Sequence, residues 1–310
     1  MTTLAKRGRT KSSGGSKVGR PSFLWSLPAF SYFAVFALLP LGVVVWLSFT
    51  EWNAIGNPKW VGTSNWKTMF SDPTLIHSFK ITGILTLLGI VTQTPISLLL
   101  GVWAAGNQRN RAILSALYFI PLLMSALAIA IVWSSLLNPY FGLPREMNWL
   151  FGSALFNHGY LFSSPASAIG VLTFVGMWQW TPFHTLIYQG GARAIPEVLY
   201  QAASIDGAGR VRQFFYITLP QLRNTMITSM VLMLAGGLTT FDTILVLTQG
   251  GPGTATTSTS YDMYVEGFKS FNFGNASVIA VLLIVVTTIV SLIAVRASGW
   301  DKMRSTQEGL

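Results

Sequence analysis

The stretch IPEVLYQAASIDGAGRVRQFFYITLP (Ile195–Pro220) is a long polar interval in an otherwise apolar sequence. Pro196 suits the first position of a helix, where its missing N–H has no partner to lose. Gly207 offers the positive φ or the close backbone contact that ends such a helix. The stretch therefore predicts a short helix, a turn at Gly207, and a second short helix over residues 210–218 that Pro220 breaks.

The composition around this stretch indicates a membrane protein. Hydrophobic residues make up 51% of the 310 residues, charged residues make up 10%, and the mean hydropathy is +0.51. A soluble domain carries about 25% charged residues. The absence of cysteine excludes disulfides, thiolate metal sites and a cysteine nucleophile.

Six apolar segments are long enough to cross a bilayer. Prolines inside them do not end a span, because neighbouring helices satisfy the freed backbone groups. We expect an all-α polytopic membrane protein whose first span is an uncleaved anchor. A permease domain over residues 25–296 would lie between a disordered basic tail (1–24) and a C-terminal tail (297–310). The predicted spans are Trp25–Phe49, Ile81–Ala105, Ala112–Leu137, Ala166–Tyr188, Thr225–Leu247 and Ala276–Val295.

Lysine and arginine are distributed unevenly between alternate loops. Of the 20 basic residues, 15 lie in the N-terminal tail, at Arg109 and Arg111, in the segment from Arg193 to Arg223, or from Arg296 to the C-terminus. Cytoplasmic loops of membrane proteins carry the excess of Lys and Arg. The charge pattern therefore predicts that both termini and the polar stretch face the cytoplasm. It also explains the net charge of +10 without a nucleic-acid partner.

No cluster of residues suggests catalysis or metal binding. The histidines His77, His158 and His184 are isolated in the sequence, and paired carboxylates or a Ser/His/Asp arrangement are missing. We expect neither an enzyme nor a bound metal or cofactor.

The spacing within the polar stretch resembles the cytoplasmic signature of permease subunits of binding-protein-dependent ABC importers. That signature is Glu-Ala-Ala, three residues, Gly, nine residues and Ile-x-Leu-Pro, and here Gln201 stands where the family has Glu. In that family the loop forms a coupling helix between spans four and five, which docks into the ATP-hydrolysing subunit. The resemblance implies a coupling role for Gln201, Ala202, Ala203, Asp206, Gly207, Ile217, Leu219 and Pro220.

Further stretches are similar to the sugar-importing branch of this family, and the resemblance extends from Leu27 to Arg296. They are Trp178–Phe183, Phe241–Pro252 and Tyr261–Ala276. The resemblance implies a second, homologous permease, two ATP-binding subunits and an extracytoplasmic sugar-binding protein as partners. No segment satisfies a phosphate-binding loop, so the energy for transport would come from those partners.

Aromatic and polar side chains in the fourth and fifth spans suit a sugar, which presents hydroxyls and flat apolar faces. The alternative is that the tryptophans face lipid or pack, and that the glutamine bonds helix to helix. The candidate pathway residues are Trp178, Gln179, Trp180, Gly237, Thr240, Phe241 and Asp242.

Asp242 is the only acidic residue inside a predicted span, so we expect it to point into the bundle. It would accept hydrogen bonds either from sugar hydroxyls or from donors on a neighbouring helix. The competing function is an ion-coupled secondary transporter, which uses intramembrane carboxylates and broken helices. No span interior carries Lys or Arg, which favours a neutral sugar over a phosphate.

Overall fold

The computed structural model describes residues 23–106, 116–146 and 161–297. The tail over residues 1–22, Arg109, Arg111, His158 and the C-terminal tail beyond residue 297 lie outside these ranges. The chain divides into two compact units, Met1–Val43 and Val44–Leu310.

The described part of the first unit is helical. The 3₁₀ turn η1 (Phe23–Ser26) leads into α1 (Leu27–Phe33), the π-helical turn η2 (Ala34–Leu38) and α2 (Leu39–Leu47). In η2 the bond from Leu39 N to Ala34 O spans five residues, directly before Pro40, whose nitrogen donates no bond. The resulting stretch Leu27–Leu47 is long and apolar enough to cross a membrane.

A small hairpin opens the second unit. Strands β1 (Thr50–Glu51) and β2 (Lys59–Trp60) pair antiparallel, and α3 (Ser64–Phe70) follows. Asn65 Nδ2, at the start of α3, donates to the carbonyl oxygens of Ser48 (3.1 Å) and Thr50 (2.8 Å). Strands in the described residues are confined to this hairpin. The structure is therefore mostly helical, as the sequence predicts.

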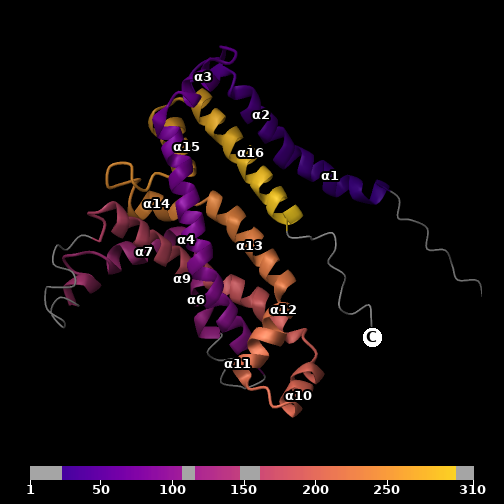
Figure 1. The fold of residues 1–310 in the computed structure, drawn as a ribbon. Coiled ribbons are helices and arrows are strands. Elements are labelled where there is room, and N and C mark those ends of the chain that lie inside the picture. The colour runs from indigo at the N-terminus through magenta and orange to yellow at the C-terminus, as the bar shows by residue number, and fades with distance from the viewer. Residues whose placement is uncertain (1–22, 107–115, 147–160, 298–310) are drawn as a thin grey trace, which may run out of the picture. The chain divides into compact units, whose positions relative to one another are not determined.

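Two long helices form the centre of this unit. Helix α4 (Pro73–Ala104) begins at Asp72, whose side chain accepts a bond from Thr74 N (2.8 Å), and α9 (Pro165–Arg193) packs along it (Figure 1). The two backbones approach closely at Gly101, where an added Cβ would lie 2.6 Å from Tyr188 Cβ. Glycine permits this approach because it has no side chain.

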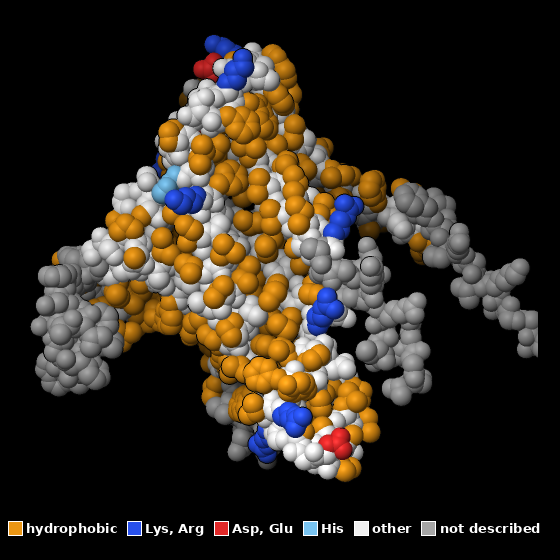
Figure 2. Space-filling view, in the orientation of Figure 1, with side chains coloured by type: hydrophobic (Ala, Val, Ile, Leu, Met, Phe, Trp, Pro, Cys, Tyr) orange, Lys and Arg blue, Asp and Glu red, His pale blue; other side chains and the backbone are white. Residues whose placement is uncertain are grey.

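The remaining helices are short, apart from α13 and α16. Figure 1 shows α10 and α11 at one end of α4, and α3 and α15 at the other. Hydrophobic side chains dominate the face seen in Figure 2, as expected of a surface that meets lipid. These elements are α6 (Ile120–Leu123), α7 (Ala126–Leu136), α10 (Glu197–Ile205), α11 (Arg210–Gln213), η3 (Phe214–Thr218), α12 (Leu219–Gln221), α13 (Arg223–Leu238), α14 (Asp242–Leu247), α15 (Thr259–Tyr264), η4 (Val265–Lys269) and α16 (Phe273–Ala297).

Two of the predicted spans are interrupted helices. The third breaks at Met124, which is extended, and restarts as α7 with Ser125 as its N-cap. The fifth breaks between Leu238, the end of α13, and Asp242, the start of α14. Among the described residues, three helical stretches are long and apolar enough to cross a membrane: Leu27–Leu47, Pro73–Ala104 and Phe273–Arg296.

Candidate functional site

A cavity of about 450 Å³ lies where α4, α9, α13 and the two helix breaks meet. Broken helices are tolerated at membrane depth where they line a polar cavity, because the freed backbone groups then find partners there. Its lining is mostly apolar, and among the apolar side chains it carries hydroxyl and amide groups, one imidazole and one carboxylate. Of the described residues that line it, none is lysine or arginine.

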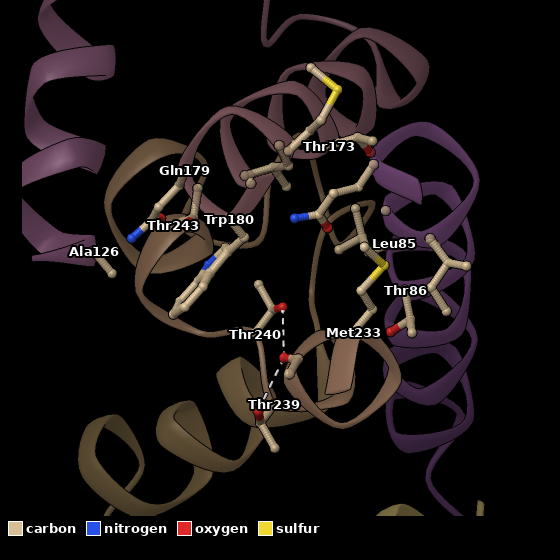
Figure 3. A pocket seen from close by; sticks show the side chains of 18 of the residues that line it. Leu85, Thr86, Ala126, Thr173, Gln179, Trp180, Met233, Thr239, Thr240 and Thr243 are labelled. Carbon is tan, nitrogen blue, oxygen red and sulfur yellow. Dashed lines mark hydrogen bonds between the residues drawn. The ribbon is translucent and has the colours of Figure 1, made fainter. Parts of the chain in front are cut away.

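Six of the seven predicted pathway residues line this cavity. Gln179 and Trp180 come from α9, and Gly237 comes from the end of α13. Trp180 is 48% exposed, and its ring projects into the same space as Thr240 (Figure 3). The others, Thr240, Phe241 and Asp242, belong to the break after α13 and to the first residue of α14.

Trp178, the seventh, is not among the described lining residues. Its ring lies edge-on to Trp133 of α7, with centroids 5.4 Å apart, and Trp133 makes a similar contact with Phe174 at 5.1 Å. Each residue of a helix is rotated by about 100° from the one before it, so Trp178 and Trp180, two positions apart, point about 200° apart. They therefore lie on different faces of α9. Trp178 therefore packs α9 against α7, as the alternative interpretation of the tryptophans holds.

The break in the fifth predicted span has a local cause. The hydroxyls of Thr239 and Thr240 both approach the carbonyl oxygen of Gly236, at 3.1 and 3.4 Å (Figure 3). Such side-chain bonds compete with the helical ladder, and two glycines in sequence, Gly236 and Gly237, weaken it further. Beyond the break, Ser258 Oγ donates to Thr240 O (3.0 Å), so the freed carbonyl is satisfied.

Gly237 has a packing role besides its place in the lining. A Cβ added there would lie 2.8 Å from the side chain of Thr86 on α4. The absence of a side chain therefore lets α13 approach α4 at the cavity wall.

Asp242 differs from its expected setting in one respect. It lies at the first turn of a short helix, and not in the middle of a continuous span. Its side chain is exposed and lines the cavity, and no described residue hydrogen-bonds its carboxylate. Within the described residues the structural role therefore has no partner, and the exposed position of the carboxylate is compatible with binding a ligand.

Among the lining residues that the sequence did not indicate are Gln93 and His184. Gln93 lies on α4, a helix in which no family motif was identified, and His184 was taken as an isolated residue. His184 Nδ1 lies 2.9 Å from Ser229 Oγ, so this imidazole bridges α9 and α13. A polar residue inside an apolar helix was the available signal for both.

The polar stretch forms a separate helical hairpin at the far end of α9. Helix α10 ends at Ile205, and Gly207 two residues later has a φ of +75°, the positive φ that the sequence predicts. Ala208 N donates to Ala203 O (2.8 Å) and Gly207 N donates to Ser204 O (3.1 Å), which caps the helix. Gln213 Nε2 donates to Ser204 Oγ and to Ala208 O, both at 2.9 Å, and this ties α11 to α10.

The prediction that Pro220 breaks the second helix is wrong. Helix α11 continues into the π-helical turn η3, where Leu219 N donates to Phe214 O, and Pro220 then falls in the first turn of α12. A proline is accommodated in a first turn because its nitrogen has no helical partner to lose.

The eight predicted coupling residues lie together in this hairpin and are mostly exposed. Gln201, Ala202, Asp206, Gly207 and Pro220 are exposed, and Ala203, Ile217 and Leu219 are partly buried. Large apolar side chains beside them are exposed too: Val198, Ile205 (86%), Val211 and Tyr216. An exposed apolar patch of this kind indicates an interaction surface.

The base of the hairpin is continuous with the helices of the cavity. Leu222, just beyond α12, is fully buried with Leu98 of α4 and Tyr188 of α9. Phe214 and Leu219 pack against this cluster. Movement of the hairpin would therefore act on the packing between α4 and α9.

On the opposite side of the cavity, the segment after α14 returns to α4. Thr259 N donates to Thr82 Oγ1 on α4 (2.9 Å). Burial raises the pKa of the Asp262 carboxyl from 3.8 to about 6. A hydrogen bond with Ser78 acts in the lowering direction, and the charges of Asp72 and Glu266 add to the rise.

A helical membrane protein with an exposed hairpin at one end, and with a cavity between broken helices that carries polar groups, has the features of a membrane transport protein. The family described as "Binding-protein-dependent transport system inner membrane component" matches residues 97–299. The chain belongs to this family of ABC transporter permeases, which are transport components of the inner membrane and not enzymes.

Similar proteins include permeases with different named substrates. The trehalose/maltose transport system permease protein MalF of Thermococcus litoralis is 31% identical over 277 residues, which cover 87% of this chain and 92% of the relative. The sn-glycerol-3-phosphate transport system permease protein UgpA of Yersinia enterocolitica is 30% identical over 279 residues, covering 86% and 91%.

Among solved structures, a chain of a bacterial alginate ABC transporter, in complex with alginate pentasaccharide-bound periplasmic protein, has a similar fold. The TM-score is 0.76 at 22% sequence identity, over 89% of this chain and 93% of that chain.

Proposed function

We propose that this chain is the membrane-spanning permease subunit of an ABC importer that passes a neutral sugar, an oligosaccharide or a glycoside, into the cytoplasm. An extracytoplasmic binding protein would deliver the sugar, and two separate ATP-binding subunits would drive its passage. A second, homologous permease would complete the membrane part. The relatives named for trehalose, maltose and other sugars support this assignment.

The observation that carries the proposal is the chemistry of the cavity. Sugars bind through hydroxyls and through flat apolar faces, which match amides, hydroxyls, a carboxylate and an indole ring. Gln179, Thr240 and Asp242 supply the polar groups, and Trp180 supplies the ring.

The same lining separates a neutral sugar from an anionic substrate. A phosphate or a uronate prefers arginine or lysine, and the described lining residues include neither. Its one charged group, the Asp242 carboxylate, would repel an anion. The UgpA relatives are named for sn-glycerol 3-phosphate, so this difference within the family is open to test.

The exposed hairpin is the proposed contact with the ATP-binding subunit. Gly207, the Ala202–Ala203 face and the neighbouring exposed Ile205 would dock there. Because the hairpin base packs with α4 and α9, docking would be transmitted to the walls of the cavity.

The topology proposed from the charge pattern has six spans with both termini and this hairpin in the cytoplasm. The third and fifth spans would be the interrupted helices of the cavity. The permease domain would cover residues 25–296, between tails over 1–24 and 297–310.

The test is uptake by the complete complex in proteoliposomes, with ATP inside and the binding protein outside. Radiolabelled trehalose, maltose, raffinose and sn-glycerol 3-phosphate form the panel. We expect ATP-dependent uptake of a neutral sugar and none of the phosphate. Uptake driven by an ion gradient without ATP would support the secondary transporter instead, and uptake of the phosphate alone would contradict the neutral-sugar assignment.

A further inference from the structure

Two glutamines in the cavity wall carry buried polar atoms without a partner in the described protein. Gln93 of α4 is 6% exposed and Gln179 of α9 is 4% exposed, and both line the cavity. The atoms are Gln93 Nε2, a donor, and Gln179 Oε1, an acceptor. Each of the two helices thus presents an amide atom that no described residue satisfies.

Several nearby buried polar side chains on α4 and α9 behave differently, although Tyr188 Oη on α9 is a further unpartnered atom. Thr82 and Thr86 donate to carbonyls of their own helix, at 2.8 and 2.7 Å, and His184 bonds Ser229. A short hydroxyl satisfies itself on its own helix, whereas a glutamine amide sits too far from the backbone to do so. An unpartnered buried amide is unfavourable for folding and requires an explanation of its own.

We propose that Gln93 is a specificity-determining residue of the permease, which donates a hydrogen bond to a hydroxyl of the sugar in transit while Gln179 accepts one from another hydroxyl. The proposal rests on the proposed function of the cavity. An amide binds a neutral hydroxyl without requiring a charge, so this arrangement selects the position of hydroxyls on a neutral ring. A site built to bond a hydroxyl rejects an analogue that lacks it, because the amide is then left unpaired.

The positions of the two amides support a role in discriminating between sugars, and not only in holding a sugar in the cavity. They come from different helices that pack along each other, α4 and α9, and α4 carries none of the four stretches that resemble the family. The base of these helices joins the hairpin through Leu98 and Tyr188. A sugar that forms hydrogen bonds with both amides would therefore contact α4 and α9, the two helices whose packing the hairpin would influence.

The experiment compares uptake of the best-transported sugar of the panel with uptake of each of its monodeoxy analogues by the complete complex. We expect the wild type to discriminate against at least one analogue by about tenfold or more, the equivalent of one lost hydrogen bond to an otherwise unpaired group. Gln93→Leu should abolish discrimination at that one position and preserve it at the others.

A second variant and a control keep the outcome clear. Gln93→Met retains an unbranched side chain of similar length, and should give the same loss of discrimination if Gln93→Leu assembles poorly. Thr92→Val serves as the control on the same helix, because the Thr92 hydroxyl donates to Leu88 O (2.7 Å) and Thr92 does not line the cavity. It should leave the discrimination pattern unchanged.

The melting temperature of the complex separates a ligand role from a structural one. If Gln93 binds the sugar, removing its unpaired amide should leave the melting temperature unchanged or raise it, and selectivity should still change. Unchanged analogue discrimination in both Gln93 variants would overturn the proposal while leaving sugar transport established. If the wild-type complex transports no sugar of the panel, the proposed function fails, and this proposal fails with it.

Discussion

Gly207 permits a direct test of the coupling role proposed for the exposed hairpin. Its φ is +75°, a conformation that side chains of L-residues rarely adopt, and a Cβ added there would meet nothing within 4 Å. Gly207→Val therefore strains the backbone without creating a clash inside the chain. Any loss of function must arise from the altered turn or from contact with a partner subunit.

The size of the effect follows from the backbone conformation. A left-handed backbone costs an L-residue about 1–2 kcal/mol, which reduces the population of the capped turn by a factor of about 5 to 30. We expect Gly207→Val to lower binding-protein-stimulated ATP hydrolysis by at least about fivefold in the reconstituted complex. The amount of permease inserted in the membrane should stay at the wild-type value, because Gly207 is exposed and packs against no other part of this chain.

Gly209 is the matched control two residues away. It is also exposed with no atom within 4 Å of an added Cβ, but its φ is −70°. Gly209→Val should keep most of the stimulated hydrolysis. If Gly207→Val retains wild-type hydrolysis and uptake, or if both variants lose activity equally, the backbone argument for this turn is refuted.

Three other predictions concern topology, helix packing and pH. The chain has no native cysteine, so single cysteines can be labelled selectively. Ser204→Cys should react with an impermeant maleimide only in inside-out vesicles, and Ile55→Cys should react only in spheroplasts. Labelling of both variants from one side would contradict the six-span topology. Gly101→Val should destabilise the solubilised complex by about 1–3 kcal/mol, because the valine side chain would meet the backbone of α9. Gly83→Val is the control, since a side chain there meets open space. Equal melting temperatures of the two variants would exclude the tight contact at Gly101. The raised pKa of Asp262 means that the folded protein holds this proton more tightly than the unfolded chain, so the stabilisation is full below about pH 4 and is lost as pH rises through about 6. Asp262→Asn should remove this part of the pH dependence of the melting temperature between pH 4 and 8, and parallel curves would show that another group is responsible.

Much of the fold and of the candidate site followed from local sequence patterns. The positive φ of Gly207 was predicted because a glycine after a short polar helix is a local signal. The cores of α4, α9 and α16 were predicted because long apolar runs need no tertiary information to be recognised. The π-helical turn before Pro220 was missed, since a proline by itself predicts only a break.

The sequence by itself determined the membrane class, the family and the helix–turn–helix character of the polar stretch, because composition and spacing are properties of the chain alone. Only the tertiary structure decided where the helices break and which side chains meet. Trp178 and Trp180 are neighbours in one motif, but the helical rotation places one against Trp133 and the other in the cavity. Gln93 belongs to no motif, and its unpaired amide became visible only once α4 and α9 were packed together, since whether a polar group finds a partner depends on residues far away in the sequence.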